Sequence, residues 1–81
     1  MKVRVLLFAR LKELVGSDSV EMEVPEGATL GDLWRRIQTV TPSLQAFPHP
    51  PLMARNLEYA GADTPLTGDE EVAFLPPMSG G

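Results

Sequence analysis

The sequence contains no cysteine, and this absence removes three kinds of chemistry. Disulfide bonds, thiolate metal sites and cysteine nucleophiles are all excluded. If the protein takes part in sulfur chemistry, the reactive sulfur must therefore be carried on another group of the chain.

Long apolar runs are also missing, since no stretch approaches the roughly 20 residues that a membrane-spanning helix needs. The apolar segment after Arg4 is short, charge returns at Arg10, and no small-residue cleavage site follows. These features do not fit a secretory signal peptide. We therefore expect no membrane partner and a cytoplasmic location.

Positive charge is scarce, with 7 Lys and Arg residues against 11 Asp and Glu residues and a net charge of −4. The only adjacent basic pair is Arg35 and Arg36. Nucleic-acid binding usually needs a concentrated basic patch, so no nucleic-acid partner is expected. An acidic surface instead suits a protein that docks on other proteins.

Residues suited to catalysis or metal binding are few and scattered. The single histidine, His49, stands between two prolines without a nearby nucleophile or further ligands. Glu21, Glu23 and residues 69–71 are acidic clusters, which we expect to be solvated on a strand face and in a turn. Neither common phosphate-loop spacing of glycines is present. We therefore expect no catalytic side chain, bound metal or bound cofactor.

The first half of the chain alternates between strand and helix patterns. Residues 3–9 are β-branched or apolar and predict a strand with apolar residues on both faces. Residues 10–16 predict a short helix that ends at Gly16. Strict alternation over residues 19–24 predicts a half-exposed strand.

Residues 29–40 predict the main helix. Thr29 and Asp32 have the spacing of a capping box, with Asp in place of the usual Glu or Gln. The apolar residues that follow recur at helical spacing and predict a stripe packed on the sheet. They are Leu30, Leu33, Trp34, Ile37 and Val40.

The second half is richer in turn residues. Residues 42–51 hold four prolines, as a domain linker would, but each flank is too short for a domain, so we expect a surface loop. Strands are predicted over residues 52–56, 57–59 and 70–75, with turns between residues 60 and 68.

This order of elements predicts an α+β fold, with one main helix on a mixed sheet of about five strands. It matches a ubiquitin-like β-grasp, in which the first and last strands are adjacent and parallel. Residues 1–75 would form this domain and residues 76–81 an extended tail. The tail would leave the sheet close to Arg10 and Lys12.

The tail ends in Gly80 and Gly81 after a double proline. Two glycines alone are a weak signal, because they also occur as leftover residues. Here Pro76 and Pro77 favour an extended backbone that leaves the sheet, and glycine can pass through a narrow channel. We therefore expect the tail to be the functional part of the chain.

The functional group of the tail would be its terminal carboxylate, which is a poor electrophile until it is joined to AMP. A nucleophile can then displace AMP. A lysine amine would give a protein conjugate, whereas a sulfur donor would give a thiocarboxylate. A chain without cysteine could carry sulfur in this way.

Two blocks of the sequence resemble the small subunit of molybdopterin synthase, a family of β-grasp sulfur carriers. The first is VLLFARLKELVG at residues 5–16, and the second is PLTGDEEVAFLPPMSGG at residues 65–81. The Phe-Leu-Pro-Pro-x-x-Gly-Gly ending is the more specific of the two. Residues 38–55 match the family less well and hold extra prolines.

The resemblance implies a reaction cycle for Gly81. An activating enzyme would adenylate Gly81 with ATP and magnesium, and a sulfur donor would convert the adenylate to a thiocarboxylate, leaving a 1-thioglycine. The carrier would then dock on the large synthase subunit and give its sulfur to a cyclic pyranopterin precursor. The chain would be a non-catalytic sulfur-donor subunit in a heterotetramer of two small and two large subunits.

The resemblance also implies residue roles. Gly81, with Gly80, would carry the reaction. Phe8, Tyr59 and Leu75 match positions on the face toward the partner, although Tyr59 replaces a more usual aliphatic residue. Lys12 matches a basic position near the base of the tail. The other residues implied in partner binding are Phe74, Pro76, Pro77, Met78 and Ser79.

Three other functions remain open on the sequence alone. Carriers for thiamine synthesis or transfer RNA thiolation also end in Gly-Gly. A ubiquitin-like modifier would join the same terminus to lysine side chains. A binding module with an inert tail is the third alternative.

Overall fold

Five strands form one mixed sheet in the computed structural model, which describes residues 1–46, 51–68 and 70–76. Their order across the sheet is β2-β1-β5-β3-β4. The strands are β1 (Lys2–Leu7), β2 (Ser19–Glu23), β3 (Leu52–Arg55), β4 (Glu58–Tyr59) and β5 (Glu71–Leu75). This arrangement confirms the predicted β-grasp fold.

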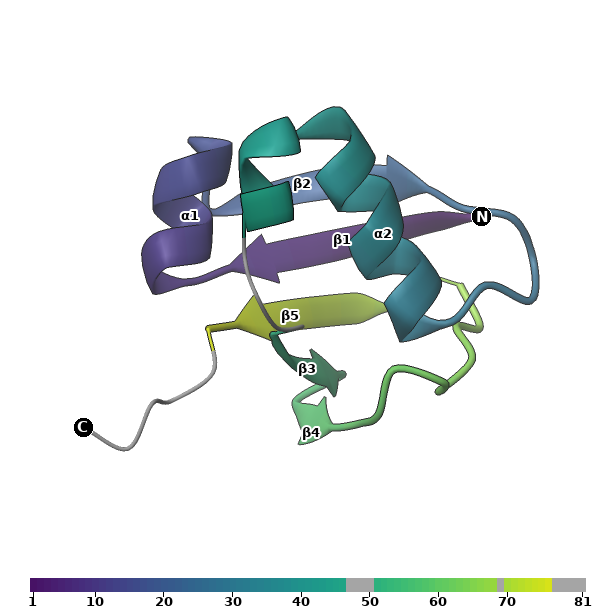
Figure 1. The fold of residues 1–81 in the computed structure, drawn as a ribbon. Helices are drawn as coiled ribbons and strands as arrows, with labels where there is room; N and C mark the ends of the chain where they lie inside the picture. Colours follow the sequence, from purple (N-terminus) through teal and green to yellow (C-terminus); the bar gives the residue numbers. More distant parts are fainter. Residues whose placement is uncertain (47–50, 69, 77–81) are drawn as a thin grey trace.

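The first and last strands are adjacent and parallel, as predicted, while all other neighbours are antiparallel. Leu6 lies opposite Ala73, and Leu7 lies opposite Phe74. Because the two strands run in the same direction, they end at the same edge of the sheet. That edge carries α1 (Ala9–Val15), as Figure 1 shows.

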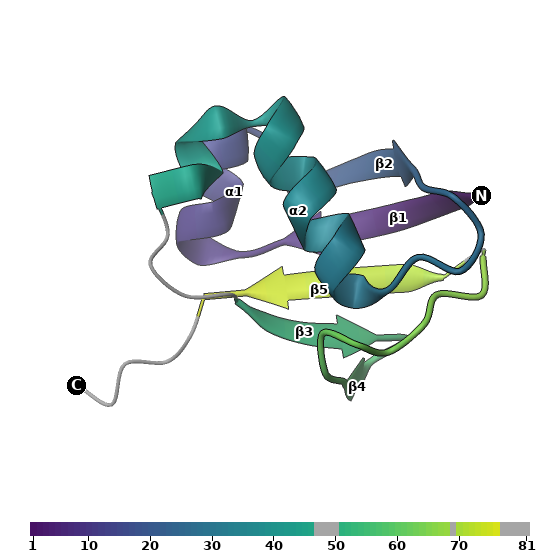
Figure 2. The same ribbon diagram turned by 45° about the vertical axis from the view of Figure 1, so that its right-hand side comes forward.

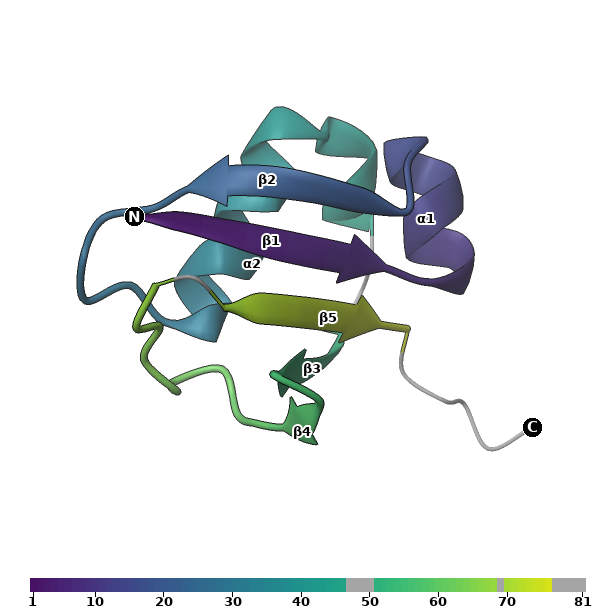
Figure 3. The same ribbon diagram turned by 180° about the vertical axis from the view of Figure 1, so that it is seen from behind.

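All helices lie on one face of the sheet. They are α1, α2 (Leu30–Val40) and the 3-10 helix η1 (Pro42–Ala46). The rotated view in Figure 2 shows α2 crossing the sheet diagonally, and Figure 3 shows the opposite face with no described element over it. One face of the sheet therefore builds the core, and the other is available for contacts.

The capping box at the start of α2 forms as predicted. The Thr29 hydroxyl accepts a hydrogen bond from the backbone N–H of Asp32 at 3.2 Å, and Asp32 Oδ2 accepts from the backbone N–H of Thr29 at 2.9 Å. Arg35 donates to the other Asp32 oxygen. The backbone N–H of Thr29 and the Arg35 guanidinium hold the pKa of the Asp32 carboxyl below its usual range.

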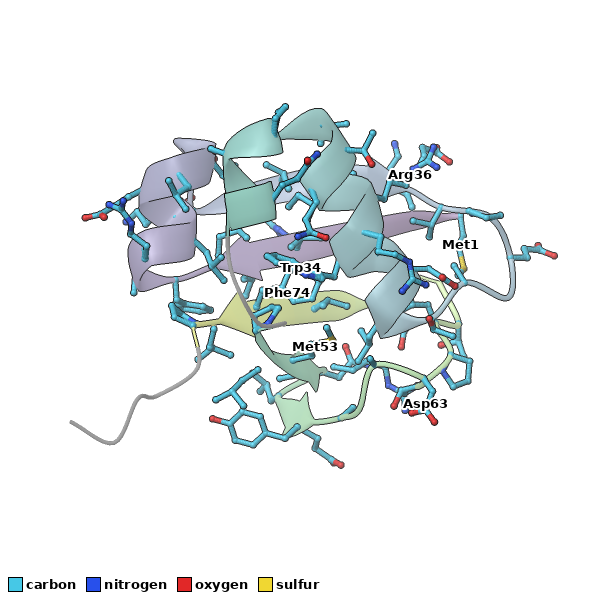
Figure 4. The ribbon with its side chains drawn as sticks, in the orientation of Figure 1. Met1, Trp34, Arg36, Met53, Asp63 and Phe74 are labelled. Atoms are coloured by element: carbon cyan, nitrogen blue, oxygen red, sulfur yellow. The ribbon has the colours of Figure 1, made fainter. Side chains whose placement is uncertain are left out.

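The core lies between α2 and the central strands. The edge of one aromatic ring meets the face of the other in the pair Trp34 and Phe74, whose centroids are 5.3 Å apart. Met53 lies beside them in Figure 4. The largest fully buried side chains are Phe74, Leu7, Leu11, Leu30, Leu33, Ile37, Leu44, Val3, Val5 and Val72.

The prediction of a surface loop over residues 42–51 is wrong for residues 42–46, because they form the 3-10 helix η1. Leu44 is fully buried, so its side chain anchors η1 in the core. Gln38 Nε2 donates to the backbone oxygen of Leu44 at 3.3 Å, which holds η1 against α2. His49 and the prolines at 48 and 50 lie outside the described residues.

The prediction of a solvated acidic turn is also wrong for Glu70. This side chain is buried, and its Oε1 accepts hydrogen bonds from the backbone N–H groups of Thr67 and Gly68. Its Oε2 lies 3.3 Å from Arg55 Nε, and the Arg55 guanidinium also donates to Pro65 O at 2.9 Å. Glu70 therefore ties the loop before β5 to β3.

Residues Glu21, Glu23 and Glu71 are exposed, which confirms their predicted solvation. Asp69 lies outside the described residues. Neighbouring acidic residues therefore differ: the Glu70 carboxylate is buried and supports the fold, whereas that of Glu71 is exposed to solvent.

We expect Glu70→Gln to lower the free energy of unfolding by about 1–3 kcal/mol, because the amide keeps an oxygen for the Thr67 and Gly68 N–H groups but sets an NH2 group against the Arg55 guanidinium. Glu71→Gln changes the exposed neighbour in the same way and should stay within about 0.5 kcal/mol of the wild type. Urea unfolding measures both. Equal losses for the two variants would contradict the structural role of Glu70.

We expect the contribution of Asp32 to the free energy of unfolding to depend on pH. Its pKa is lowered in the folded chain, so its ionised form stabilises the fold above about pH 3.9, the ordinary aspartate value. This contribution is lost as the pH falls through the lowered pKa. Asp32→Asn should therefore be less stable than wild type at neutral pH, and the gap should shrink in acid. Urea unfolding at several pH values tests this, and a constant gap would contradict it.

Candidate functional site

The open face of the sheet carries a row of apolar side chains. Leu6, Ala73, Ala54 and Tyr59 lie opposite one another in register across β1, β5, β3 and β4. Leu6 and Ala73 alternate with the buried residues of β1 and β5, so they point away from the helices. Ala54 and Tyr59 lie on the same side by register, although Ala54 is only 8% exposed. Tyr59 is 73% exposed at the outer end of this row.

A second apolar row lies nearer the edge where β1 and β5 end. Leu52 lies opposite Leu75. Phe8 follows β1 directly, and its extended backbone continues the alternation of the strand, so its side chain turns away from the core. Phe8 is 43% exposed and Leu52 is 40% exposed. We call the two rows together the apolar patch: Leu6, Phe8, Leu52, Ala54, Tyr59, Ala73 and Leu75.

The other half of the open face is charged. Arg4 lies between Glu71 and Glu21 in register, and Lys2 lies opposite Glu23. These side chains are all exposed. The face therefore divides into an apolar half near the end of β5 and a charged half near its beginning, as in interfaces that combine an apolar centre with a polar rim.

The patch meets the base of the tail at the end of β5. Leu7 lies opposite Phe74, so Phe8 and Leu75 come one position later on neighbouring strands. Pro76, the last described residue, is half-buried. Residues leaving β5 therefore start beside the apolar patch.

Basic side chains of α1 flank the same edge. Lys12 is exposed and lines a shallow hollow together with Leu6 and Phe8. Arg10 pairs with Glu13 at 3.2 Å. Within the described part of the chain, no acidic group pairs with Lys12, so its charge is open to a partner.

Comparison with known sequences identifies the family. The sequence pattern of the ThiS family matches residues 5–81. The chain belongs to the ThiS family. That match covers every described element apart from the start of β1.

Full-length relatives of this ThiS-family chain share about a third of its residues. The molybdopterin synthase sulfur carrier subunit of Escherichia coli is 36% identical over 98% of this chain and 99% of the relative. That of Dictyostelium discoideum is 33% identical over 96% and 94%. Among solved structures, SAMP1 from Haloferax volcanii is 30% identical, covers all of both chains and gives a TM-score of 0.86.

The ThiS-family structure brings several predicted site residues together. Phe8, Lys12, Leu75 and Pro76 lie at one edge of the sheet, and Tyr59 closes the apolar row on β4. The remaining predicted residues lie outside the described part of the chain: Pro77, Met78, Ser79, Gly80 and Gly81.

The prediction that Phe74 contacts a partner is wrong. Phe74 is fully buried and packs against Trp34 on the helix side of the sheet. The reason is the alternation of β5, which sends Phe74 to the core and Leu75 to the open face.

Four members of the apolar patch were not predicted: Leu6, Leu52, Ala54 and Ala73. The sequence did indicate Leu6, because a strand that is apolar on both faces must place some apolar side chains on the face away from the core. Ala54 and Ala73 gave no signal, since small residues on strands are common on either face. Their place on the patch depends on strand pairing.

The described residues form neither a metal-binding cluster nor a membrane-spanning helix. No three His, Asp or Glu side chains there gather to hold a metal ion. No described helix is both long enough and apolar enough to cross a membrane. The apolar patch is thus the main candidate site in this part of the chain.

We expect the two phenylalanines beside the sheet edge to respond differently to the same substitution. Phe74→Leu should lower the free energy of unfolding by about 1–2 kcal/mol, because it leaves a cavity beside Trp34. Phe8→Leu should change it by less than about 0.5 kcal/mol. Urea unfolding compares the two variants, and similar losses would contradict the separation of patch from core.

Proposed function

We propose that this chain is the sulfur-carrier subunit of a molybdopterin synthase in the cytoplasm. The observation that carries the proposal is the position of the apolar patch, which lies beside the end of β5, from which the chain continues to Gly81. The near-full-length similarity to relatives with that name supports it. A contact surface beside the end of β5 is what a group carried on the tail would need, and this supports the proposal.

The proposed chemistry begins at the carboxylate of Gly81. In an activating enzyme that uses ATP and magnesium, a carboxylate oxygen attacks the α-phosphorus and pyrophosphate leaves. A sulfur donor then attacks the carbonyl carbon of the adenylate, and AMP leaves. The product is a thiocarboxylate on Gly81, which this cysteine-free chain can carry without a thiol side chain.

The thiocarboxylate then passes sulfur to a cyclic pyranopterin precursor, and two rounds build the dithiolene of molybdopterin. The large synthase subunit supplies the pocket for this precursor and most of the acid and base groups. Glycines at positions 80 and 81 suit passage into that pocket because they have no side chain beyond a hydrogen.

The folded part of this chain supplies the docking surface. The apolar patch packs on the large subunit, where burial of Phe8, Tyr59 and Leu75 excludes water. Lys12, whose charge is open, pairs with an acidic group of that partner. Two small and two large subunits make the working heterotetramer.

A protein modifier is the second candidate function. The similarity to SAMP1, a small archaeal modifier protein of Haloferax volcanii, favours it. The same adenylate attacked by a lysine amine instead of sulfur would give an isopeptide. The two functions share activation and differ in the nucleophile.

We expect deletion of Gly81 to abolish thiocarboxylate formation while leaving the fold and docking intact. The folded core and the apolar patch do not include Gly81, whereas its carboxylate is the acceptor of AMP. The measurement is intact mass after incubation with an activating enzyme, ATP, magnesium and a sulfur donor. Wild type should gain the mass difference between sulfur and oxygen.

The control for this deletion is Val40→Ala, an exposed change on α2 that keeps the terminal carboxylate and should still be modified. Complementation of cells that lack their own molybdopterin carrier tests the pathway. Rescue by the deleted chain would overturn the proposal. Rescue only of thiamine synthesis, or conjugates on lysines without molybdopterin formation, would favour the alternatives.

A further inference from the structure

Backbone strain lies beside the apolar patch. Among the described residues, three other than glycine have positive φ angles: Ala9 at 52°, Asn56 at 50° and Leu57 at 72°. Such angles are unfavourable for residues with a side chain, and they gather at functional sites more often than elsewhere. Here Ala9 follows Phe8, and Leu57 comes two residues before Tyr59.

The strain at Leu57 arises in a tight hairpin turn. Arg55 pairs with Glu58, so Asn56 and Leu57 are the only residues that join β3 to β4. A two-residue turn with both φ angles positive strongly favours Asn followed by Gly.

Asn56, the first residue of this turn, is the favoured type, whereas Leu57 stands where Gly is favoured. Asn56 tolerates positive φ, and it is held by hydrogen bonds with the backbone of Glu71 at 2.9 and 3.2 Å. Leu57 has a bulky side chain that is 91% exposed. Burial within the chain therefore does not offset the strain at Leu57.

The β3–β4 hairpin carries both charged and apolar groups: Arg55, Asn56 and Glu58 line a small hollow at its turn together with Tyr59. Leu52 and Tyr59 line a shallow hollow that has no charged residue in its lining. The other lining residues are Pro51, Met53, Ala60, Gly61 and Ala62. Figure 2 shows β3 and β4 at the sheet edge opposite β2, so a partner lying on the patch can also reach the hairpin.

We propose that Leu57 is a further docking residue, and that the β3–β4 hairpin extends the apolar patch onto the large synthase subunit. This inference rests on the function proposed above. The patch already reaches the hairpin through Tyr59, which is two residues from Leu57 along the chain. A partner that covers Tyr59 buries the Leu57 side chain, and this burial offsets the backbone strain only in the complex.

The test is Leu57→Gly, with two measurements on the full chain. Glycine relieves the positive φ, so the melting temperature should rise by several degrees. The same change removes the apolar side chain, so the affinity for the large subunit should fall about tenfold by titration calorimetry. If Leu57 had only a structural role, its replacement would not raise the melting temperature and lower the affinity for the large subunit at the same time.

Two more variants separate strain from apolar contact. Leu57→Asn keeps a side chain of similar size that tolerates positive φ, so it should also raise the melting temperature and weaken docking. Val40→Asn removes another exposed apolar side chain, on α2 over the opposite face of the sheet, and should leave docking unchanged.

The outcomes distinguish this inference from the proposed function. If wild type binds the large subunit and Leu57→Gly binds equally well, the inference is overturned and the function stands. A melting temperature that does not rise overturns the strain argument. If wild type does not bind the large subunit, both proposals fall.

Discussion

The parallel pairing of β1 with β5 is the constraint on which the rest of the structure depends. It joins the two ends of the chain in the middle of the sheet, and it brings the ends of both strands to one edge. Phe8, Lys12 and Leu75 are close because of this pairing. A hairpin between the same strands would send their ends in opposite directions and separate the tail from the patch.

The central strands serve two surfaces at once. On β5, Phe74 packs in the core against Trp34, and its neighbour Leu75 faces outward. On β1, Leu7 and Leu6 divide in the same way. Because apolar residues lie on both faces of the central strands, this small domain keeps an exposed apolar surface of the kind that often marks a contact site.

Much of the fold follows from local sequence signals. The alternation at residues 19–24, the capping box at Thr29 and the apolar stripe of α2 all predicted their elements correctly. Val40 is the exception in the stripe, because it lies exposed at the end of α2. The burial of Leu44 and Glu70 could not be read in this way, because each depends on residues distant in sequence or on a loop conformation. Likewise Phe74 and Leu75 are both apolar neighbours, and the pairing of β5 decides which of them faces the open side of the sheet.

The position of β5 between two strands also has a mechanical consequence. A force applied through the residues after Leu75 acts along the strand, so it loads the hydrogen bonds to β1 and β3 in shear, many at a time. Bonds loaded together resist far more than bonds opened one after another. If the end of the chain enters other proteins, as the proposed function requires, an inner last strand would help the domain keep its fold under such loads.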